Sequence, residues 1–218
     1  MFCYVIGVFA LIIIVLYGLI ELHYFLRTCF SVILARFFKE KVSVLQETTV
    51  KGLYFSKLSF RICLTTDIDT FLYHMNNARF MRELDFARAD FYERTGLYRC
   101  IRSKNGGIAV GATTIRYRRF VRLFSRYIIT SKVVYWDEQG IYMEHRFITP
   151  RDNFVNAIAV CKTRLLNCNV DEVMNELLSV TEISGMENGT KLKPPMPPEV
   201  AKWIESNEIS SAILRNLC

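Results

Sequence analysis

Two carboxylates, one imidazole and two amides lie within eleven consecutive residues, from Asp67 to Asn77. The second acid is Asp69, and His74 and Asn76 follow it after a short apolar gap. A segment with helical spacing of its apolar residues begins directly behind them. A carboxylate can activate water or attack a carbonyl carbon, and the free backbone N–H groups at the start of a helix stabilise developing negative charge. This stretch is therefore our candidate active site.

The run His-Met-Asn-Asn-Ala-Arg-Phe at residues 74–80, behind an Asp-x-Asp pair, resembles the signature of hotdog-fold acyl-CoA thioesterases. The resemblance covers roughly residues 45–180. It implies an α+β hotdog fold, in which an antiparallel sheet wraps around one long central helix. It also implies a homodimer that binds an acyl-CoA or another acyl thioester between its subunits. Coenzyme A would then be part of the substrate, and we expect no separate cofactor.

The same resemblance assigns roles within the candidate site. It implies that Asp69 is the catalytic carboxylate, and that backbone N–H groups around Asn76 and Asn77 stabilise the oxyanion. An alternative for both acids is that they cap the turn before the helix, and we favour this alternative for Asp67. His74 acts in some plant acyl-carrier-protein thioesterases with a similar run, but those have an Asn where this chain has Phe71. A loop histidine bonded to backbone is thus the alternative for His74.

Another branch of the fold places its catalytic carboxylate on the central helix, where this chain has Glu83 and Asp85. Glu83 lies one residue off the apolar stripe of the predicted helix. We therefore expect Glu83 to face solvent or an arginine, and the same reasoning applies to Asp85.

Basic residues are concentrated between positions 116 and 132, where the sequence contains no acid. They are Arg116, Arg118, Arg119, Arg122, Arg126 and Lys132. The guanidinium fork pairs well with phosphate, so we take the first four as candidate contacts to the phosphates of coenzyme A. Anionic lipid headgroups or a solvated strand face are the alternatives.

Several classes of protein are not indicated by the sequence. It contains no Gly-x-Ser-x-Gly, no glycine-rich phosphate loop and no spaced His/Cys cluster, so we expect no metal site. The seven cysteines are scattered and odd in number, which favours reduced thiols. The net charge of +7 fits attraction to anionic membrane lipids or to a phosphorylated ligand. We expect no nucleic acid as a partner.

The elements that would position this site begin with an apolar N-terminus. Residues 2–20 carry no charge, and this apolar run is long enough for a membrane-spanning helix. No signal-peptide cleavage pattern follows it. Lys and Arg occur only after this run, so the positive-inside rule predicts a single-pass protein with its domain in the cytosol. The expected location is the endoplasmic reticulum membrane. Secretion after cleavage and a buried core helix are the alternatives.

We divide the chain into a membrane anchor (1–26), an amphipathic juxtamembrane segment (27–44), a hotdog domain (45–180) and a C-terminal part (181–218) with a Pro-containing linker and a helix. Within the domain, one strand precedes the active-site stretch and the central helix ends near Gly96. Four β-rich runs follow, over Gly107–Tyr117, Leu123–Trp136, Gly140–Ile148 and Asn153–Leu165. Their short connections predict that each strand is the antiparallel neighbour of the next.

Overall fold

The computed structural model describes residues 2–20, 22–50, 61–183 and 193–215. In chain order its elements are α1 (Phe2–Ile20), α2 (Leu22–Phe37), β1 (Thr48–Val50), β2 (Arg61–Ile62), the 3-10 turn η1 (Thr65–Asp67), α3 (Asn77–Thr95), α4 (Leu97–Ser103), β3 (Gly107–Tyr117), β4 (Arg126–Asp137), β5 (Gly140–Thr149), β6 (Phe154–Leu166), α5 (Val170–Ile183) and α6 (Pro198–Arg215). The four predicted β-rich runs are all strands, with ends that differ by up to three residues. The strand predicted before the active-site stretch lies partly outside the described residues.

The strands form one antiparallel sheet in the order β1-β4-β5-β6-β3, and β2 pairs with β4 beside this path. The tight connections β4–β5 and β5–β6 join neighbours, as predicted. The prediction is wrong for β3 and β4, because β3 pairs with β6 at the far edge of the sheet. Residues 118–125 therefore cross one end of the sheet, and this crossing brings the basic segment to the start of α3.

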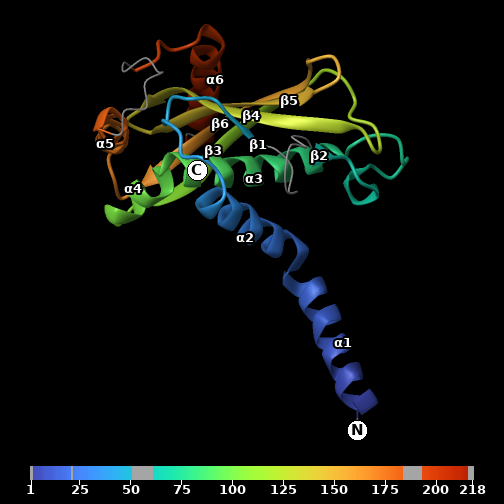
Figure 1. Ribbon diagram of the computed structural model, residues 1–218. Helices are drawn as coiled ribbons and strands as arrows, with labels where there is room; N and C mark the ends of the chain where they lie inside the picture. Colours follow the sequence, from blue (N-terminus) through green and yellow to red (C-terminus); the bar gives the residue numbers. More distant parts are fainter. Residues whose placement is uncertain (1, 21, 51–60, 184–192, 216–218) are drawn as a thin grey trace.

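Helix α3 is the central helix of the fold and lies against one face of the sheet (Figure 1). Its stripe of Phe80, Leu84, Ala87 and Phe91 is fully or almost fully buried. The helix ends at Gly96, whose φ of 76° lies in the left-handed region that glycine adopts without strain. The predicted α+β architecture, an antiparallel sheet around one long helix, is confirmed.

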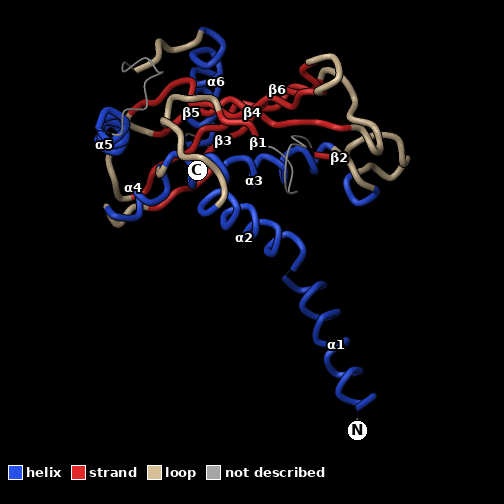
Figure 2. The backbone as a smooth tube through the Cα atoms, viewed as in Figure 1, coloured by secondary structure: helices blue, strands red, loops and turns tan. Residues whose placement is uncertain are grey.

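Helix α2 packs beside α3, and ion pairs join the two (Figure 2). Arg36 Nη2 lies 3.0 Å from Glu93 Oε1, and Lys39 pairs with Asp90. The two acids are buried and the two bases partly exposed. The basic residues behind the apolar N-terminus thus neutralise acids on the central helix.

Helix α1 projects away from the domain (Figure 1). Most of its large apolar side chains are exposed, among them Tyr4 at 83% and Phe9 at 65%. In the described parts of the chain, no helix combines the length and the apolarity that crossing a bilayer requires. The predicted transmembrane helix within residues 1–26 is therefore not confirmed.

The C-terminal helix α6 lies on the face of the sheet opposite α3 (Figure 1). Its Trp203 ring contacts Tyr142 edge-on, with centroids 6.4 Å apart. The predicted C-terminal helix is thus present, whereas most of the linker predicted before it lies outside the described residues.

A buried histidine of β5 makes stability depend on pH. His145 is fully buried, and its Nδ1 lies 2.8 Å from Ser131 Oγ. Burial, and secondly the charge of Arg88, lower the pKa of His145 to about 3 from the ordinary 6.5. Below pH 6.5, His145 therefore binds a proton in the unfolded chain but stays unprotonated in the folded chain. Stability is lost as pH falls through this range, by up to about 1.4 kcal/mol per pH unit.

We expect this loss from pH 6.5 down to about 3, and its part between pH 6.5 and 5 lies above the range in which carboxylates titrate. Urea denaturation at several pH values measures it. A His145→Gln protein should show a clearly shallower slope of unfolding free energy against pH. Equal slopes in both proteins would contradict the assignment to His145.

Candidate functional site

The Asp69 carboxylate is held by the backbone of its own loop. Its Oδ1 accepts from the N–H groups of Tyr73 at 3.1 Å and His74 at 3.4 Å. The Asp69 N–H donates to the His74 carbonyl, and the Asp69 carbonyl accepts from the Leu72 N–H. The hydrogen bond from Tyr73 is the main cause that lowers the pKa of Asp69 below its usual 3.8. The Asp69 side chain is therefore a carboxylate at neutral pH. It also caps the turn before the helix, which was the alternative role for this residue.

The structure brings His74 to Asp69. His74 Nε2 lies 4.0 Å from Asp69 Oδ2, and its Nδ1 lies 3.0 Å from the Met75 carbonyl. A carbonyl accepts only, so Nδ1 is the donor in this contact, and Nε2 is the ring nitrogen on the side of the Asp69 carboxylate. The ring also stacks on Phe120, with centroids 4.2 Å apart and planes 15° apart. The predicted bond to backbone is thus present, together with a nitrogen that faces the carboxylate.

Asp67 has a structural environment. It is buried, its Oδ2 accepts from the Leu64 N–H at 2.9 Å, and its Oδ1 lies 2.6 Å from Arg79 Nε. This geometry agrees with the capping role that we favoured for Asp67.

Asn76 caps α3, because its Oδ1 accepts from the Ala78 N–H at 2.8 Å. Its carbonyl accepts from the N–H groups of Arg79 and Phe80. The Asn77 N–H forms no hydrogen bond with the described residues, so at this helix start it is the donor open to a ligand. The Asn77 side chain is exposed, and the Asn77 backbone carbonyl accepts from the Tyr117 hydroxyl.

We predict that Asn76→Ala lowers the unfolding free energy by about 0.5–2 kcal/mol, because the Ala78 N–H loses its acceptor. Asn76→Asp supplies the same acceptor and should stay near the wild type. Chemical denaturation of the three proteins measures the difference. A stable Asn76→Ala protein with impaired ligand binding would instead assign the side chain to the site.

Glu83 faces arginines, one of the two environments expected for it, and it does so in the interior and not at the solvent-exposed surface. Glu83 is fully buried, with Arg27 Nη2 at 2.6 Å, Arg79 Nε at 3.6 Å and Arg61 paired to its other oxygen. These arginines hold its charge in the interior, away from any water that it could activate. Asp85 is half-buried, accepts from the Tyr24 hydroxyl at 2.9 Å and pairs with Arg88.

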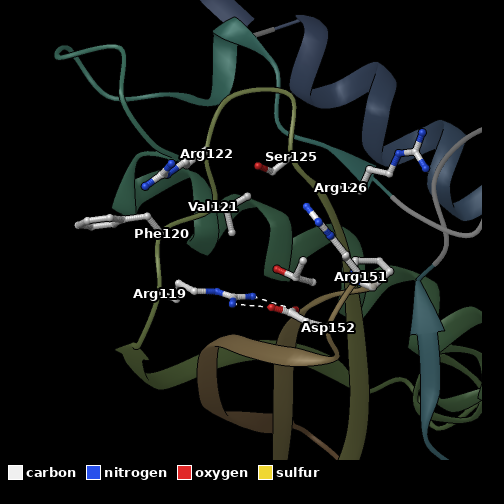
Figure 3. A pocket seen from close by; sticks show the side chains of 10 residues that line it. Arg119, Phe120, Val121, Arg122, Ser125, Arg126, Arg151 and Asp152 are labelled. Carbon is white, nitrogen blue, oxygen red and sulfur yellow. Dashed lines mark hydrogen bonds and ion pairs between the residues drawn. The ribbon is translucent and has the colours of Figure 1, made fainter.

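A basic groove lies beside the Asp69 loop. Its volume is ≈ 810 Å³, and it is lined by Arg119, Phe120, Val121, Arg122, Ser125, Arg126, Thr149, Pro150, Arg151 and Asp152 (Figure 3). Of the four predicted phosphate contacts, Arg119 and Arg122 line this groove. Arg116 and Arg118 do not line it, and the Arg118 guanidinium lies over the Phe154 ring. Arg119 makes two hydrogen bonds to Asp152, at 2.6 and 3.0 Å, which neutralise part of the charge.

The groove and the Asp69 loop share a wall. Arg122 pairs with His74 in a backbone bridge and donates from Nη2 to the Tyr73 hydroxyl at 3.2 Å. Phe120, which the sequence reasoning missed, separates the groove from His74. The interleaved Arg-Tyr-Arg-Arg-Phe pattern is the only sequence signal that points to it. No sequence pattern pointed to Arg151 and Asp152, because only the fold brings the β5–β6 turn to the groove.

The described residues contain neither a cluster of metal-ligating side chains nor a disulfide. In the described residues, no three His, Cys, Asp or Glu side chains group as metal ligands, and the described cysteines are free thiols. A carboxylate, an imidazole, one open N–H group and a basic groove remain. These groups are suited to hydrolysis of a carbonyl compound that carries a phosphorylated leaving group.

The fold and site define a hotdog protein, and residues 63–204 match the family model described as "Thioesterase-like superfamily". The chain belongs to this superfamily. Among solved structures it resembles YbaW, a probable thioesterase from Escherichia coli, with a TM-score of 0.50 and 20% identity over 61% of this chain and 95% of that one. At this identity the likeness shows the fold alone.

Two relatives are similar to the chain in sequence over almost its whole length. It is 40% identical to Protein THEM6 of Drosophila melanogaster, over 94% of this chain and 96% of that protein. It is 32% identical to Protein THEM6 of Xenopus laevis, over 92% of this chain and 87% of that protein. The resemblance to these relatives therefore extends over more of the chain than residues 63–204, which match the family model.

Proposed function

We propose that this protein hydrolyses acyl-CoA thioesters. The observation that carries the proposal is the ionised Asp69, which faces His74 beside a basic groove of ≈ 810 Å³. Asp69 takes a proton from water, and the resulting hydroxide attacks the thioester carbon. The Asn77 N–H, at the positive end of α3, stabilises the oxyanion. The thiolate leaves with a proton, so that the products are a carboxylic acid and coenzyme A.

The groove suits the phosphorylated carrier. Arg122 and Arg151 line it beside the paired Arg119 and Asp152. Guanidinium groups form bidentate hydrogen bonds with phosphate. The phosphates of coenzyme A would therefore bind in the groove, with the thioester directed toward His74.

We also propose a homodimer and a membrane location. Within the described residues, β3 is paired on one side only, which leaves an eleven-residue strand edge for a second copy. The exposed apolar side chains of α1 support attachment to a membrane. We propose that this membrane is the endoplasmic reticulum, with the domain on its cytosolic side, because Lys and Arg occur only after the apolar run. Secretion after cleavage of α1 is the alternative.

A second candidate function is a scaffold that binds acyl lipids or partner proteins without catalysis. Two observations favour it. The Asp69 carboxylate is engaged by two backbone N–H groups. Phe71 occupies the position at which some plant acyl-carrier-protein thioesterases with a similar run have an Asn.

The deciding experiment measures both binding and release of free coenzyme A with a panel of acyl-CoA substrates. We expect turnover by the full chain and turnover about 10²–10⁴-fold slower by Asp69→Asn, with similar binding by both. Binding without turnover by either protein would assign the scaffold function instead.

A further inference from the structure

Large apolar side chains are exposed at the end of the molecule that carries the candidate site. Phe71 is 87% exposed, Leu72 71% and Phe124 66%. Leu72 and Phe124 have φ values of 56° and 60°, in the left-handed region that large side chains rarely adopt. The fold therefore keeps these apolar side chains exposed to water. At Leu72 and Phe124 it does so with a strained backbone. Such strain at a surface points to a function.

These side chains belong to one surface, which we call the apolar tip. It is formed by residues 62–64, 69–74 and 118–126. The Phe124 N–H donates to the Cys63 carbonyl, which joins the first segment to the third. The Tyr73 and Phe120 rings meet edge-on with centroids 5.7 Å apart, which joins the second to the third. An exposed apolar surface built from three segments marks an interaction site.

Arginines surround the apolar tip. Five occur between residues 116 and 126, alternating with Tyr117, Phe120, Leu123 and Phe124, and no acid lies in this segment. Arg151 joins them from the β5–β6 turn, while Asp152 is bound to Arg119. Apolar side chains that enter a bilayer, flanked by cations that remain at the headgroups, are the composition expected for contact with an anionic membrane.

The position of α1 agrees with such a contact. The tip and the free end of α1 both lie at the right-hand side of Figure 1, and the rest of the molecule lies to their left. A flat membrane surface along the right-hand side of Figure 1 would therefore contact the tip and the free end of α1 without touching the sheet or α6. One bilayer could receive the exposed apolar side chains of α1 and of the tip together.

We propose that the apolar tip is a second membrane contact, in which Phe71, Leu72 and Phe124 enter the leaflet and the surrounding arginines bind anionic headgroups. A second copy of this chain is the competing occupant of the tip. Its surface would have to supply acids opposite the arginines. The excess of arginine over acid within the tip itself, together with the apolar α1 on the same side, favours lipid.

The contact has a consequence for substrate access, and this consequence rests on the proposed thioesterase function. Phe71 and Leu72 lie in the loop that holds Asp69 and His74. A tip inserted in the leaflet brings the Asp69 carboxylate to the headgroup layer. An acyl chain could then pass from the bilayer to the site without crossing water.

The test uses tryptophan fluorescence of the full chain in vesicles of phosphatidylcholine and phosphatidylserine with brominated acyl chains, which quench tryptophan at short range. Phe71→Trp and Phe124→Trp report on the tip. Tyr98→Trp, an exposed position of α4 at the other end of the domain, is the matched control. The wild type supplies the background of Trp136 and Trp203.

We expect both tip variants to lose most of their added fluorescence and to shift to shorter wavelength, and Tyr98→Trp to do neither. Vesicles without phosphatidylserine should quench the tip variants less. An unquenched signal at long wavelength, or a shift to short wavelength without quenching, would overturn the proposal, because the tip would then face water or another protein copy. Acyl-CoA hydrolysis in the same samples separates the two proposals. Quenching without hydrolysis supports the membrane contact and overturns the proposed function.

Discussion

We expect Asp69→Asn to lower the rate of acyl-CoA hydrolysis by about 10²–10⁴-fold, the usual contribution of a positioned general base. The amide oxygen of asparagine still accepts the N–H groups of Tyr73 and His74, so the loop keeps its shape. It cannot take a proton from water. The effect should therefore fall on kcat, with the affinity for acyl-CoA nearly unchanged.

The pH profile gives a second check on Asp69. Its pKa is lowered below 3.8, mainly by the hydrogen bond from the Tyr73 N–H, and the base must be ionised to act. Activity that depends on this group is therefore constant from neutral pH down to the ordinary range of carboxylates, and it is lost only below that range. A decline of kcat/KM above pH 5, in protein that is still folded, would show that a group other than Asp69 is the base.

The control for this experiment is Glu138→Gln, an exposed acid in the β4–β5 turn that lies outside the groove. It should retain wild-type kinetics. Full activity of Asp69→Asn would remove Asp69 from the mechanism and leave its carboxylate as a loop cap.

Glu83→Gln should destabilise the fold by about 3–5 kcal/mol, because removing one charge from a buried ionic cluster leaves its partners uncompensated. Arg61 is 8% exposed and Glu83 fully buried, so water cannot replace the lost carboxylate. Arg27 reaches the same carboxylate from α2 at 2.6 Å, so the variant also weakens the attachment of α2 to α3. A domain whose total stability is about 5–15 kcal/mol would lose a large part of it.

Urea denaturation measures this loss, with Glu176→Gln as the control. Glu176 pairs with Lys104 at 2.9 Å on the surface, where solvent screens the charges, and its removal should change stability little. Similar small effects of the two substitutions would show that the arginines around Glu83 find other partners.

Local patterns predicted much of the fold. The apolar stripe through Phe80, Leu84 and Phe91 indicated the central helix, and Gly96 marked its end. The alternation within the later runs located β3 to β6. The pairing of β3 with β6 was not predictable in this way, because an eight-residue connection between strands does not specify which edge of the sheet receives the next strand.

The sequence by itself determined the fold class and the stretch that carries Asp69 and His74, because helical and strand periods and a contiguous motif are local properties of the chain. Only the tertiary structure decided which groups meet there. It buried Glu83 among arginines from three different segments, placed Phe120 against His74 and tied Arg119 to Asp152. Arg61 and Arg27 lie 22 and 56 residues from Glu83, and Arg119 lies 33 residues from Asp152. Contacts over such separations depend on how the sheet closes around the helix, which no local pattern encodes.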